Sequence, residues 1–510
     1  MKTFLTNKNT RILLISCLLI AFRPCAWAQT TSKKLFIVID VIAEDTAMLH
    51  GNSIAFNMSK SDINTSYPGY TKSYSQRINS PKTRMVIPLS TPVNYGRIEL
   101  DNKTADAFKP LNNGNNLFLF QSGDTIELHL SNHKKGAFFT GKNTNKYNCM
   151  YRISNNADIV SFSQSNSYFK SKNFAAAFTS KKLQYDSIYA VQERILREFE
   201  GKFNREVFNL IGIDCQSAYH QRIIELYYGI PFMIKGYEEQ IETAKGLFIK
   251  EYGNYKEPLI KDRSLFVKSY KYADFLSAME KAYAVIINSS PEKSYYSSLK
   301  FSDIDKAIDL HNKKGILKDK LKLLALLSID KKKQADYTSY MSQIINEAGN
   351  NQFKKALIAF RDINSIGSNA FPFELPDEHG KMYKLADFKG KMVIMDFWFT
   401  GCEGCIGMAN TLKKIASEYK SNPNIIFVTV SIDRNKEIWR KSLAAETYSC
   451  KDEINLLAGM DRQSAVIQRY HINSFPTIIA ISKGGKIIST APPDPRADSA
   501  VFKRFINQHL

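Results

Sequence analysis

Along this chain of 510 residues, the spacing of the apolar positions changes twice. Over residues 29–147 the apolar residues come in short runs rich in Ile, Val and Phe, and Asn, Gly, Ser and Pro separate the runs. In Thr125–Leu130 apolar and polar residues alternate cleanly, as they do in a strand with one buried face. The pattern therefore predicts a small antiparallel β-domain. Its expected strands are Leu35–Val41, Ser53–Met58, Arg84–Leu89, Leu117–Phe120 and Thr125–Leu130.

Residues 148–362 follow a different period. Ile188, Val191, Ile195 and Phe199 fall at intervals of three and four with Glu and Arg between them, which indicates an amphipathic helix. Similar stretches follow at Ser217–Lys250, Leu265–Ile287, Ile304–Leu327 and Tyr337–Phe360. We expect an α-helical middle region that serves as a spacer, a dimerisation surface or a platform for client proteins.

From residue 366 to residue 510, strand-like and helix-like patterns alternate, which predicts an α/β domain. At its centre Val393, Ile394 and Phe397 belong to a short run of β-branched and aromatic residues, which is typical of a buried strand. Apolar residues then repeat at helical spacing from Ala409 to Tyr419. The other expected elements are a hairpin at Phe373–Leu385, strands at Ile425–Val430, Thr477–Ile481 and Lys486–Ser489, and helices at Lys436–Ala445, Gln463–Tyr470 and Asp498–His509.

Two cysteines lie between the central strand and the helix that follows it. The sequence Cys402-Glu403-Gly404-Cys405 places two residues between the sulfurs, so they can bond or separate with little backbone movement. Unpaired N–H groups and the dipole at a helix start stabilise a thiolate, and such sites lower a thiol pKa from ~8.5 to roughly 3.5–7.5. The spacing favours reversible disulfide chemistry. The alternatives are a structural disulfide and half of a zinc site, although the sequence has no second C-x-x-C or H-x-x-H.

Residues 1–28 have the pattern of a secretory signal peptide. Three cations precede an apolar run at Ile12–Phe22, and Ala26-Trp27-Ala28 fits the A-x-A cleavage pattern. A lipidated Cys25 is the alternative, but the bulky and charged residues before it do not fit a lipoprotein signal. The later sequence contains no apolar run long enough to span a bilayer. We therefore expect an exported protein of the periplasm or cell envelope.

The charge balance points away from nucleic acid. The formal net charge is +21, and removal of the four cations in residues 1–28 leaves +17. A basic protein can bind nucleic acid, but an exported protein seldom meets it. Peripheral attraction to anionic envelope surfaces, or solubility supplied by the lysines, is the expected consequence of this charge.

The cysteine count excludes a disulfide-stabilised scaffold. Besides the C-x-x-C pair, only Cys149, Cys215 and Cys450 remain after signal cleavage, and their number is odd. Cys450 lies in a polar segment beside Lys451. We expect Cys450 to be a bystander rather than a third redox partner.

The α/β region resembles the TlpA-like branch of the thioredoxin superfamily, which comprises envelope thiol–disulfide oxidoreductases. The resemblance covers residues 366–510 and rests on four motifs in order: FELPDEHGKMYKLADFKGKMVIMDFW, the C-E-G-C, VTVSIDRNKEIW and YHINSFPTIIAISKGGKI. The segments LFLFQSGDTIELHL and FTGKNTNKYN are similar to an N-terminal module that often precedes such domains. The resemblance implies a multidomain protein whose C-terminal domain has the thioredoxin fold.

The resemblance also implies roles for four residues. Cys402 is similar to the exposed attacking thiol, and Cys405 is similar to the buried thiol that resolves the mixed disulfide. Pro476 matches a cis-proline that lies against the disulfide and presents backbone to the substrate. Asp396 stands where thioredoxins keep a buried acid that relays the proton of the second thiol, because burial raises a carboxyl pKa towards that of a thiol. The alternative for Asp396 is a solvated carboxylate at the strand end.

The neighbours of the cysteines depart from the family. Gly401 stands where Trp is usual and Gly404 where Pro is common, and the family's Glu after the second cysteine has no counterpart. Glu403 places a carboxylate between the thiols, which disfavours the thiolate and opposes the helix dipole. We therefore predict a reducing pair, with Lys391 and Lys413 as the cations that could offset Glu403.

Together these features predict an exported thiol–disulfide oxidoreductase of the protein disulfide reductase type. Its Cys402 thiolate would attack a disulfide of a client protein, and Cys405 would resolve the mixed disulfide. No metal or other cofactor is required, and the family implies a membrane-embedded thiol donor of electrons. Two alternatives stay open. One is a thiol peroxidase, although the Pro and Thr spacing of peroxiredoxins is missing before Cys402. The other is a non-catalytic binding or scaffold protein of the envelope.

Overall fold

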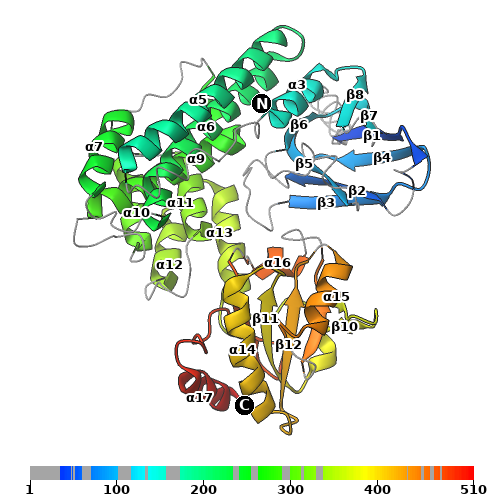
Figure 1. Ribbon diagram of the computed structural model, residues 1–510, viewed down its shortest axis with the longest axis vertical. Coiled ribbons are helices and arrows are strands. Elements are labelled where there is room, and N and C mark those ends of the chain that lie inside the picture. The colour runs from blue at the N-terminus through cyan, green and yellow to red at the C-terminus, as the bar shows by residue number, and fades with distance from the viewer. Residues whose placement is uncertain are drawn as a thin grey trace, which may run out of the picture.

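The protein is described here from a computed structural model, which covers residues 35–46, 49, 52–59, 71–101, 116–131, 136–156, 173–233, 240–253, 262–289, 299–311, 315–328, 337–433, 435–449, 453–459, 465–470, 472 and 474–510. In chain order these residues form a β-rich region, a helical region and a mixed α/β domain (Figure 1). The multidomain fold class predicted from the sequence is therefore confirmed. The predicted signal peptide and Cys450 lie outside the described residues.

Within the described residues, the β-rich region consists of two four-stranded sheets, ordered β4-β1-β7-β8 and β3-β2-β5-β6. The strands are β1 (Phe36–Ala43), β2 (Ser53–Ser59), β3 (Thr71–Arg77), β4 (Lys82–Pro88), β5 (Val93–Asp101), β6 (Leu117–Gln121), β7 (Thr125–Ser131) and β8 (Gly136–Gly141). In β7 the apolar face predicted from the alternating sequence is buried, since Ile126, Leu128 and Leu130 are all nearly inaccessible to solvent. The neighbouring strands β1 and β7 run parallel, whereas the other pairs described in these sheets are antiparallel as expected.

The helical region begins directly after β8. Its helices are α3 (Asn145–Asn155), α5 (Phe174–Glu198), α6 (Arg205–Met233), α7 (Ile241–Tyr252), α8 (Ser264–Lys268), α9 (Tyr270–Asn288), α10 (Phe301–His311), α11 (Ile316–Ser328), α12 (Tyr337–Glu347) and α13 (Asn351–Asn364). Each long stretch predicted from residue 217 onward contains two helices rather than one. The break at Ser269 has a clear cause: its hydroxyl accepts the Tyr272 N–H and caps the start of α9. In the part of the chain that is described, no helix is both long and apolar enough to cross a bilayer.

The β-rich and helical regions share one apolar core. Buried apolar side chains from Ile37 in β1 to Phe360 in α13 form a single connected cluster. At the junction, the Lys146 ammonium lies 2.6 Å from the Asp124 carboxylate, and both side chains are almost fully buried. The Tyr147 hydroxyl donates to the same carboxylate at 2.6 Å. A buried charge is tolerated where it is paired and hydrogen-bonded in this way, so the first turn of α3 is fixed against the β-rich region.

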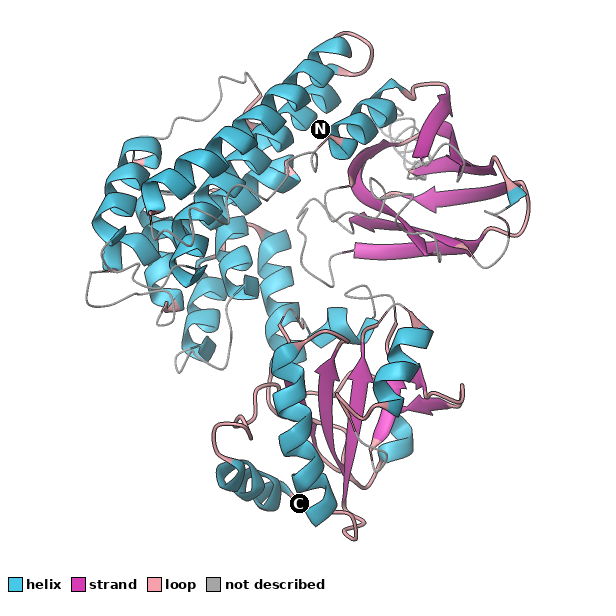
Figure 2. Ribbon diagram, viewed as in Figure 1, coloured by secondary structure: helices cyan, strands magenta, loops and turns pink. Residues whose placement is uncertain are grey.

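The C-terminal domain is a five-stranded sheet, ordered β13-β12-β11-β14-β15, with helices on both sides (Figure 2). Its elements are β9 (Glu374–Pro376), β10 (Met382–Lys384), η6 (Leu385–Phe388), β11 (Met392–Trp398), α14 (Glu403–Glu418), β12 (Ile425–Ser431), α15 (Lys436–Ala444), β13 (Ile454–Leu457), α16 (Ala465–Tyr470), β14 (Thr477–Ile481), β15 (Ile487–Ser489) and α17 (Ser499–His509). The central strand β11 pairs in parallel with β12 and antiparallel with β14. Every residue of β11 is buried.

The two faces of β11 pack into different cores. Met392 and Ile394 contact the core under α14 and α17, whereas Val393, Met395 and Phe397 belong to the core on the opposite face. Because side chains alternate along a strand, Asp396 points to the same face as Ile394. Asp396 therefore lies on the α14 side, near the end of β11 that leads into the two cysteines.

Candidate functional site

Cys402 and Cys405 form a disulfide at the start of α14, with 5.3 Å between their Cα atoms. Cys402 is the N-cap residue of the helix, and its sulfur accepts the Cys405 N–H at 3.2 Å. The first N–H groups of a helix have no partner inside the helix, so a sulfur at this position receives donors and the positive end of the dipole. Cys402 is 7% exposed and Cys405 is fully buried. The attacking thiol expected to be exposed is thus only slightly exposed in the oxidised form.

Polar contacts hold the turn that leads from β11 to Cys402. The Thr400 N–H and hydroxyl donate to the Asp433 carboxylate at 3.0 and 2.7 Å. The Gly401 N–H donates to the Tyr448 hydroxyl at 2.8 Å. Gly401 has a φ of +97°, a conformation that side chains other than glycine rarely adopt. This backbone conformation explains why the Trp usual in the family does not stand at Gly401.

Aromatic side chains pack around the disulfide. Trp398 is fully buried and stacks on Tyr448 with ring centroids 4.9 Å apart. Phe399 meets Phe475 edge to face at 5.4 Å. These rings and the two cysteines belong to one small apolar cluster with Trp439. The cluster limits the access of water to the sulfurs from this side.

Pro476 lies against the start of α14, and its peptide bond with Phe475 is cis. A Cβ atom built on Gly404 would come within 3.3 Å of the Pro476 Cδ and 3.6 Å of an Arg496 nitrogen. A glycine between the cysteines therefore lets the proline ring approach the helix closely. The departure at Gly404 noted in the sequence has this structural reason.

Asp396 is 2% exposed, which excludes the solvated carboxylate considered from the sequence. The Arg496 side chain lies at the helix start and donates to the Gly404 carbonyl at 3.2 Å. The hydrogen bond with Asp494 is the main cause that raises the pKa of Arg496, and attraction to Asp396 adds to it. Sequence reasoning missed Arg496, because it stands 92 residues after Gly404 in a loop without any local motif.

The lysines proposed as partners for the site lie elsewhere. Lys391 precedes the far end of β11, which places it about 20 Å from the cysteines at ~3.3 Å per residue. Lys413 lies about 15 Å along α14 from Glu403 at ~1.5 Å per residue, and it donates to the Glu446 carbonyl. Glu403 itself is exposed, so water screens its charge. Among the residues that the structure describes, Arg496 is a cation beside the helix start. Lys391 and Lys413, which could have offset Glu403, lie too far along their elements to do so.

Cys149 and Cys215 are unbonded and buried in the shared core of the β-rich and helical regions. Burial raises the pKa of the Cys149 thiol to about 12. Burial also raises the pKa of the Cys215 thiol, and the neighbouring Asp214 carboxylate raises it further. Both thiols are therefore held neutral at ordinary pH.

Comparisons with known proteins agree with this geometry. A family model described as thioredoxin-like matches residues 390–487. The thiol-disulfide oxidoreductase ResA of Bacillus subtilis is 29% identical over 135 residues, which are 26% of this chain and 70% of that protein. ResA of Geobacillus thermodenitrificans is 27% identical over 146 residues, which are 29% of this chain and 76% of that protein. The C-terminal region is thus a thioredoxin-like domain related to thiol–disulfide oxidoreductases, and the resemblance inferred from the sequence is confirmed.

Solved structures of similar proteins match part of this chain. The thioredoxin domain of a thiol-disulfide oxidoreductase from Bacteroides vulgatus is 28% identical, with a TM-score of 0.25. That match covers 29% of this chain and 99% of the other. A thiol:disulfide interchange protein from Bacteroides sp. is 30% identical, with a TM-score of 0.26 over 28% of this chain and 92% of the other.

Proposed function

We propose that this protein is an exported thiol–disulfide oxidoreductase that reduces disulfide bonds in client proteins. One observation carries the proposal: the Cys402 sulfur caps α14 and accepts a backbone N–H there, while Cys405 lies bonded to it one turn into the helix. This arrangement stabilises a thiolate at Cys402 once the pair is reduced. The names of the related ResA proteins support the same class of chemistry.

The reaction proceeds by two thiol–disulfide exchanges. The Cys402 thiolate attacks one sulfur of the client disulfide, forms a mixed disulfide and releases the other client sulfur as a thiolate. The Cys405 thiol then loses its proton and attacks the Cys402 sulfur. The Cys402–Cys405 disulfide closes and the second client thiol leaves, so that two electrons have passed to the client. The described pair is the oxidised product of this cycle.

Two neighbours have roles in these steps. Asp396, buried on the α14 face, accepts the proton of Cys405 during the second exchange, as a buried carboxylate can exchange a proton with a thiol near neutral pH. Pro476 lies against the helix start and presents backbone to the client segment beside Cys402. Both roles act at the second thiol and the client rather than at the first thiolate.

The cycle needs a reductant for the closed disulfide. We propose a membrane-embedded thiol donor, with the mature protein in the periplasm or cell envelope after removal of residues 1–28. The net charge of +17 left after this removal from +21 favours peripheral contact with anionic envelope surfaces. No metal or cofactor takes part in the exchange.

Insulin reduction by the full mature chain tests this function. With dithiothreitol as the reductant, we expect turnover that disappears in Cys402→Ser. Equilibration with glutathione buffers tests the direction of electron flow: we expect a midpoint more negative than about −180 mV, the potential of protein disulfide isomerase. A more positive midpoint would identify an oxidase or isomerase instead of a reductase. Wild-type chain without insulin-reducing activity would leave the scaffold function or the thiol peroxidase, and a peroxide-consumption assay would separate these two.

A further inference from the structure

The Tyr448 hydroxyl lies beside the cysteine that begins the proposed exchange. It accepts the Gly401 N–H at 2.8 Å, and Gly401 directly precedes Cys402. Because consecutive backbone nitrogens are at most about 3.6 Å apart, the hydroxyl oxygen lies within roughly 6.5 Å of the Cys402 nitrogen. The Tyr448 ring stacks on Trp398, with 4.9 Å between the centroids and 8° between the planes. The stacking and the hydrogen bond together hold the hydroxyl at the start of α14.

Hydrogen-bond donors outnumber acceptors around the disulfide. Tyr448 accepts one N–H, and among the residues that the structure describes its own O–H has no acceptor. The indole N–H groups of Trp398 and Trp439 are buried and are likewise unpaired within the described part of the chain. All three side chains belong to the apolar cluster that contains Cys402 and Cys405. A buried donor without a partner is unusual, and a redox role is one of the causes that explain it.

Reduction of the disulfide supplies an acceptor to this cluster. A sulfur in a disulfide is a weak acceptor, whereas a thiolate accepts charge-assisted hydrogen bonds that are roughly twice as strong as neutral ones. Once the Cys402–Cys405 bond opens, the Cys402 sulfur is free to turn about its Cα–Cβ bond while the Tyr448 ring stays stacked. The donors of the cluster therefore suit the reduced pair better than the oxidised pair.

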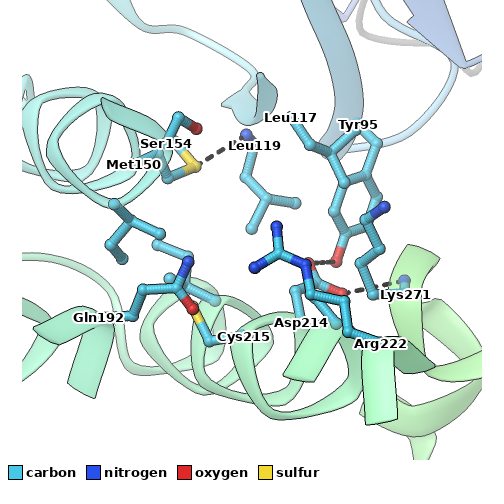
Figure 3. A pocket seen from close by; sticks show the side chains of 13 residues that line it. Tyr95, Leu117, Leu119, Met150, Ser154, Gln192, Asp214, Cys215, Arg222 and Lys271 are labelled. Carbon is cyan, nitrogen blue, oxygen red and sulfur yellow. Dashed lines mark hydrogen bonds between the residues drawn. The ribbon is translucent and has the colours of Figure 1, made fainter. Parts of the chain in front are cut away.

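A tyrosine hydroxyl already pairs with a buried anion elsewhere in this protein. In the shared core of the β-rich and helical regions, the Tyr95 hydroxyl donates to the Asp214 carboxylate at 2.7 Å (Figure 3). Burial raises the pKa of Asp214, and the hydrogen bonds from Ser269 and Tyr95 oppose this rise. A tyrosine hydroxyl in an apolar core can thus stabilise an anion that the surroundings otherwise disfavour.

A hydroxyl proton without an acceptor does not by itself indicate redox chemistry. Tyr470 is also buried, and its hydroxyl accepts the Phe371 N–H at 2.8 Å with no acceptor for its own proton among the described residues. Tyr470 packs in the core on the other face of β11, whose described members include no cysteine. What sets Tyr448 apart is the cysteine beside it.

We propose that the Tyr448 hydroxyl donates a hydrogen bond to the Cys402 thiolate in the reduced protein. The inference rests on the proposed redox function, in which this thiolate attacks the client disulfide. The hydrogen bond keeps Cys402 ionised before the attack. As the Cys402 sulfur bonds to one client sulfur, the negative charge leaves on the other client sulfur and the hydrogen bond is released. Tyr448 keeps its own proton throughout, and it is a catalytic residue because it touches the reacting sulfur.

The charged groups described near Cys402 remain in place when the hydroxyl is removed. They are Glu403 beside it in α14, Arg496 at the helix start, Asp433 at the preceding turn and Asp396 in β11. A change in the pKa of Cys402 on removal of the hydroxyl therefore reports the lost hydrogen bond rather than an altered charge.

The pH dependence of Cys402 alkylation in the reduced, full mature chain tests the proposal. Iodoacetamide reacts with the thiolate, and tandem mass spectrometry assigns the modified sulfur at each pH. Tyr448→Phe removes the hydroxyl and keeps the ring that stacks on Trp398. We expect the midpoint of alkylation to rise by about one pH unit, because a hydrogen bond to a charged group stabilises it about tenfold or more. The redox midpoint in glutathione buffers should become more negative by about 30 mV, which corresponds to the same tenfold change.

Three further variants separate donation to the sulfur from support of the turn. Tyr470→Phe is the matched control, because it removes a buried hydroxyl that accepts a backbone N–H over the same distance. Thr400→Val removes the hydroxyl that donates to Asp433 in the turn before Cys402. Both variants should keep the alkylation midpoint of the parent. Replacement of Tyr448 by 3-fluorotyrosine, a stronger donor of nearly the same shape, should lower the midpoint below that of the parent.

An unchanged midpoint in Tyr448→Phe would overturn the proposal, and so would an equal rise in Tyr470→Phe or Thr400→Val. A rise with 3-fluorotyrosine would overturn it as well, because it would show that only the packing against Trp398 matters. Alkylation requires no client protein. A raised midpoint in Tyr448→Phe therefore supports the hydrogen bond even if the parent does not reduce insulin, so this inference and the proposed function can fail separately.

Discussion

The redox pair Cys402 and Cys405 and the two unbonded cysteines Cys149 and Cys215 differ in what surrounds their sulfurs. Cys402 and Cys215 are each 7% exposed, and Cys405 and Cys149 are each fully buried. Exposure alone therefore does not distinguish the redox pair from the other two thiols. What differs is the group that faces each sulfur.

The position of each cysteine in its helix sets that group. Cys402 caps α14, where the backbone N–H groups of the first turn are still available to its sulfur. Cys149 and Cys215 stand inside α3 and α6, where the N–H groups bond to carbonyls one turn earlier. Their sulfurs face apolar side chains, and the pKa of Cys149 rises to about 12. Backbone N–H donors at a helix start thus make a cysteine thiol reactive, whereas apolar surroundings keep it protonated and unreactive.

The largest expected effect is on activity. Cys402→Ser and Cys405→Ser should each reduce insulin turnover to the background of the reductant, because each removes a sulfur that the exchange requires. The double variant Cys149→Ala, Cys215→Ala should keep turnover within about twofold, since the change leaves only a small cavity far from the chemistry. Insulin precipitation followed by turbidity measures both. Substantial loss of activity in the double variant would assign the buried thiols a part in the cycle.

The next effect is on alkylation. In the reduced, folded protein at pH 7, the ionised fraction of the Cys149 thiol, with a pKa of about 12, is only ~10⁻⁵. A thiol at a helix start, with a pKa of roughly 3.5–7.5, is largely ionised at the same pH. Iodoacetamide should therefore modify Cys402 at least about a thousandfold faster than Cys149. From pH 7 to pH 9 the rate at Cys149 should rise about tenfold per unit, while the rate at Cys402 levels off.

Mass spectrometry of each modified peptide gives these rates. In a denaturant Cys149, Cys215, Cys402 and Cys405 should react at similar rates, because the helix start and the apolar core are both lost. Comparable labelling of Cys215 and Cys402 in the folded protein would contradict the comparison between the two pairs.

The sequence predicted the redox pair and its supporting strand because their signals are local. The run at Val393–Phe397 and the helical spacing after Cys405 each extend over a few neighbouring residues. The strand β3 gave no such signal, since most of its side chains are exposed and its sequence, TKSYSQR, is polar throughout. Its strand form depends on pairing with β2, which only the folded protein shows.

The sequence did not show which residues far apart along the chain lie close together in the folded protein. Arg496 reaches the start of α14 from a loop near the end of the chain. Lys391 and Lys413 were chosen because they are close to the cysteines along the chain, and the extended strand and the straight helix carry both away. Charges near a site can be predicted from sequence only where both partners stand within about one turn of the same helix or on neighbouring positions of one strand face.

A smaller effect is expected from the buried acid. Asp396→Asn should slow the resolution of the mixed disulfide about tenfold or more, because the Cys405 thiol loses its proton acceptor. The defect should shrink as the pH rises, since hydroxide then removes the proton. Quenched-flow trapping of the mixed disulfide measures the step, and Glu418→Gln, at an exposed carboxylate of α14, is the matched control. An unchanged rate of resolution would limit Asp396 to a packing role.

The smallest effect concerns Arg496. Arg496→Gln removes the positive charge that lies beside the start of α14 and donates to the Gly404 carbonyl. A nearby cation favours a thiolate, so its loss should raise the pKa of the Cys402 thiol, by about half a unit at a partly exposed site. Loss of thiolate stabilisation destabilises the reduced form, so the midpoint potential should move to a more negative value.

The thiolate absorbance of the reduced protein, titrated in a background with Cys149, Cys215 and Cys450 all replaced by alanine, measures this pKa as the first ionisation of the remaining pair. Arg504→Gln is the control, because Arg504 is exposed on α17 and the charge change is the same. The difference between Arg496→Gln and the parent should largely vanish in 1 M salt, where the Debye length falls to about 3 Å. A pKa that stays constant or falls in Arg496→Gln would show that Arg496 only anchors its own loop. The stabilisation of Cys402 would then come from hydrogen-bond donors without a nearby cation, and the contrast between the two cysteine pairs would rest on those donors alone.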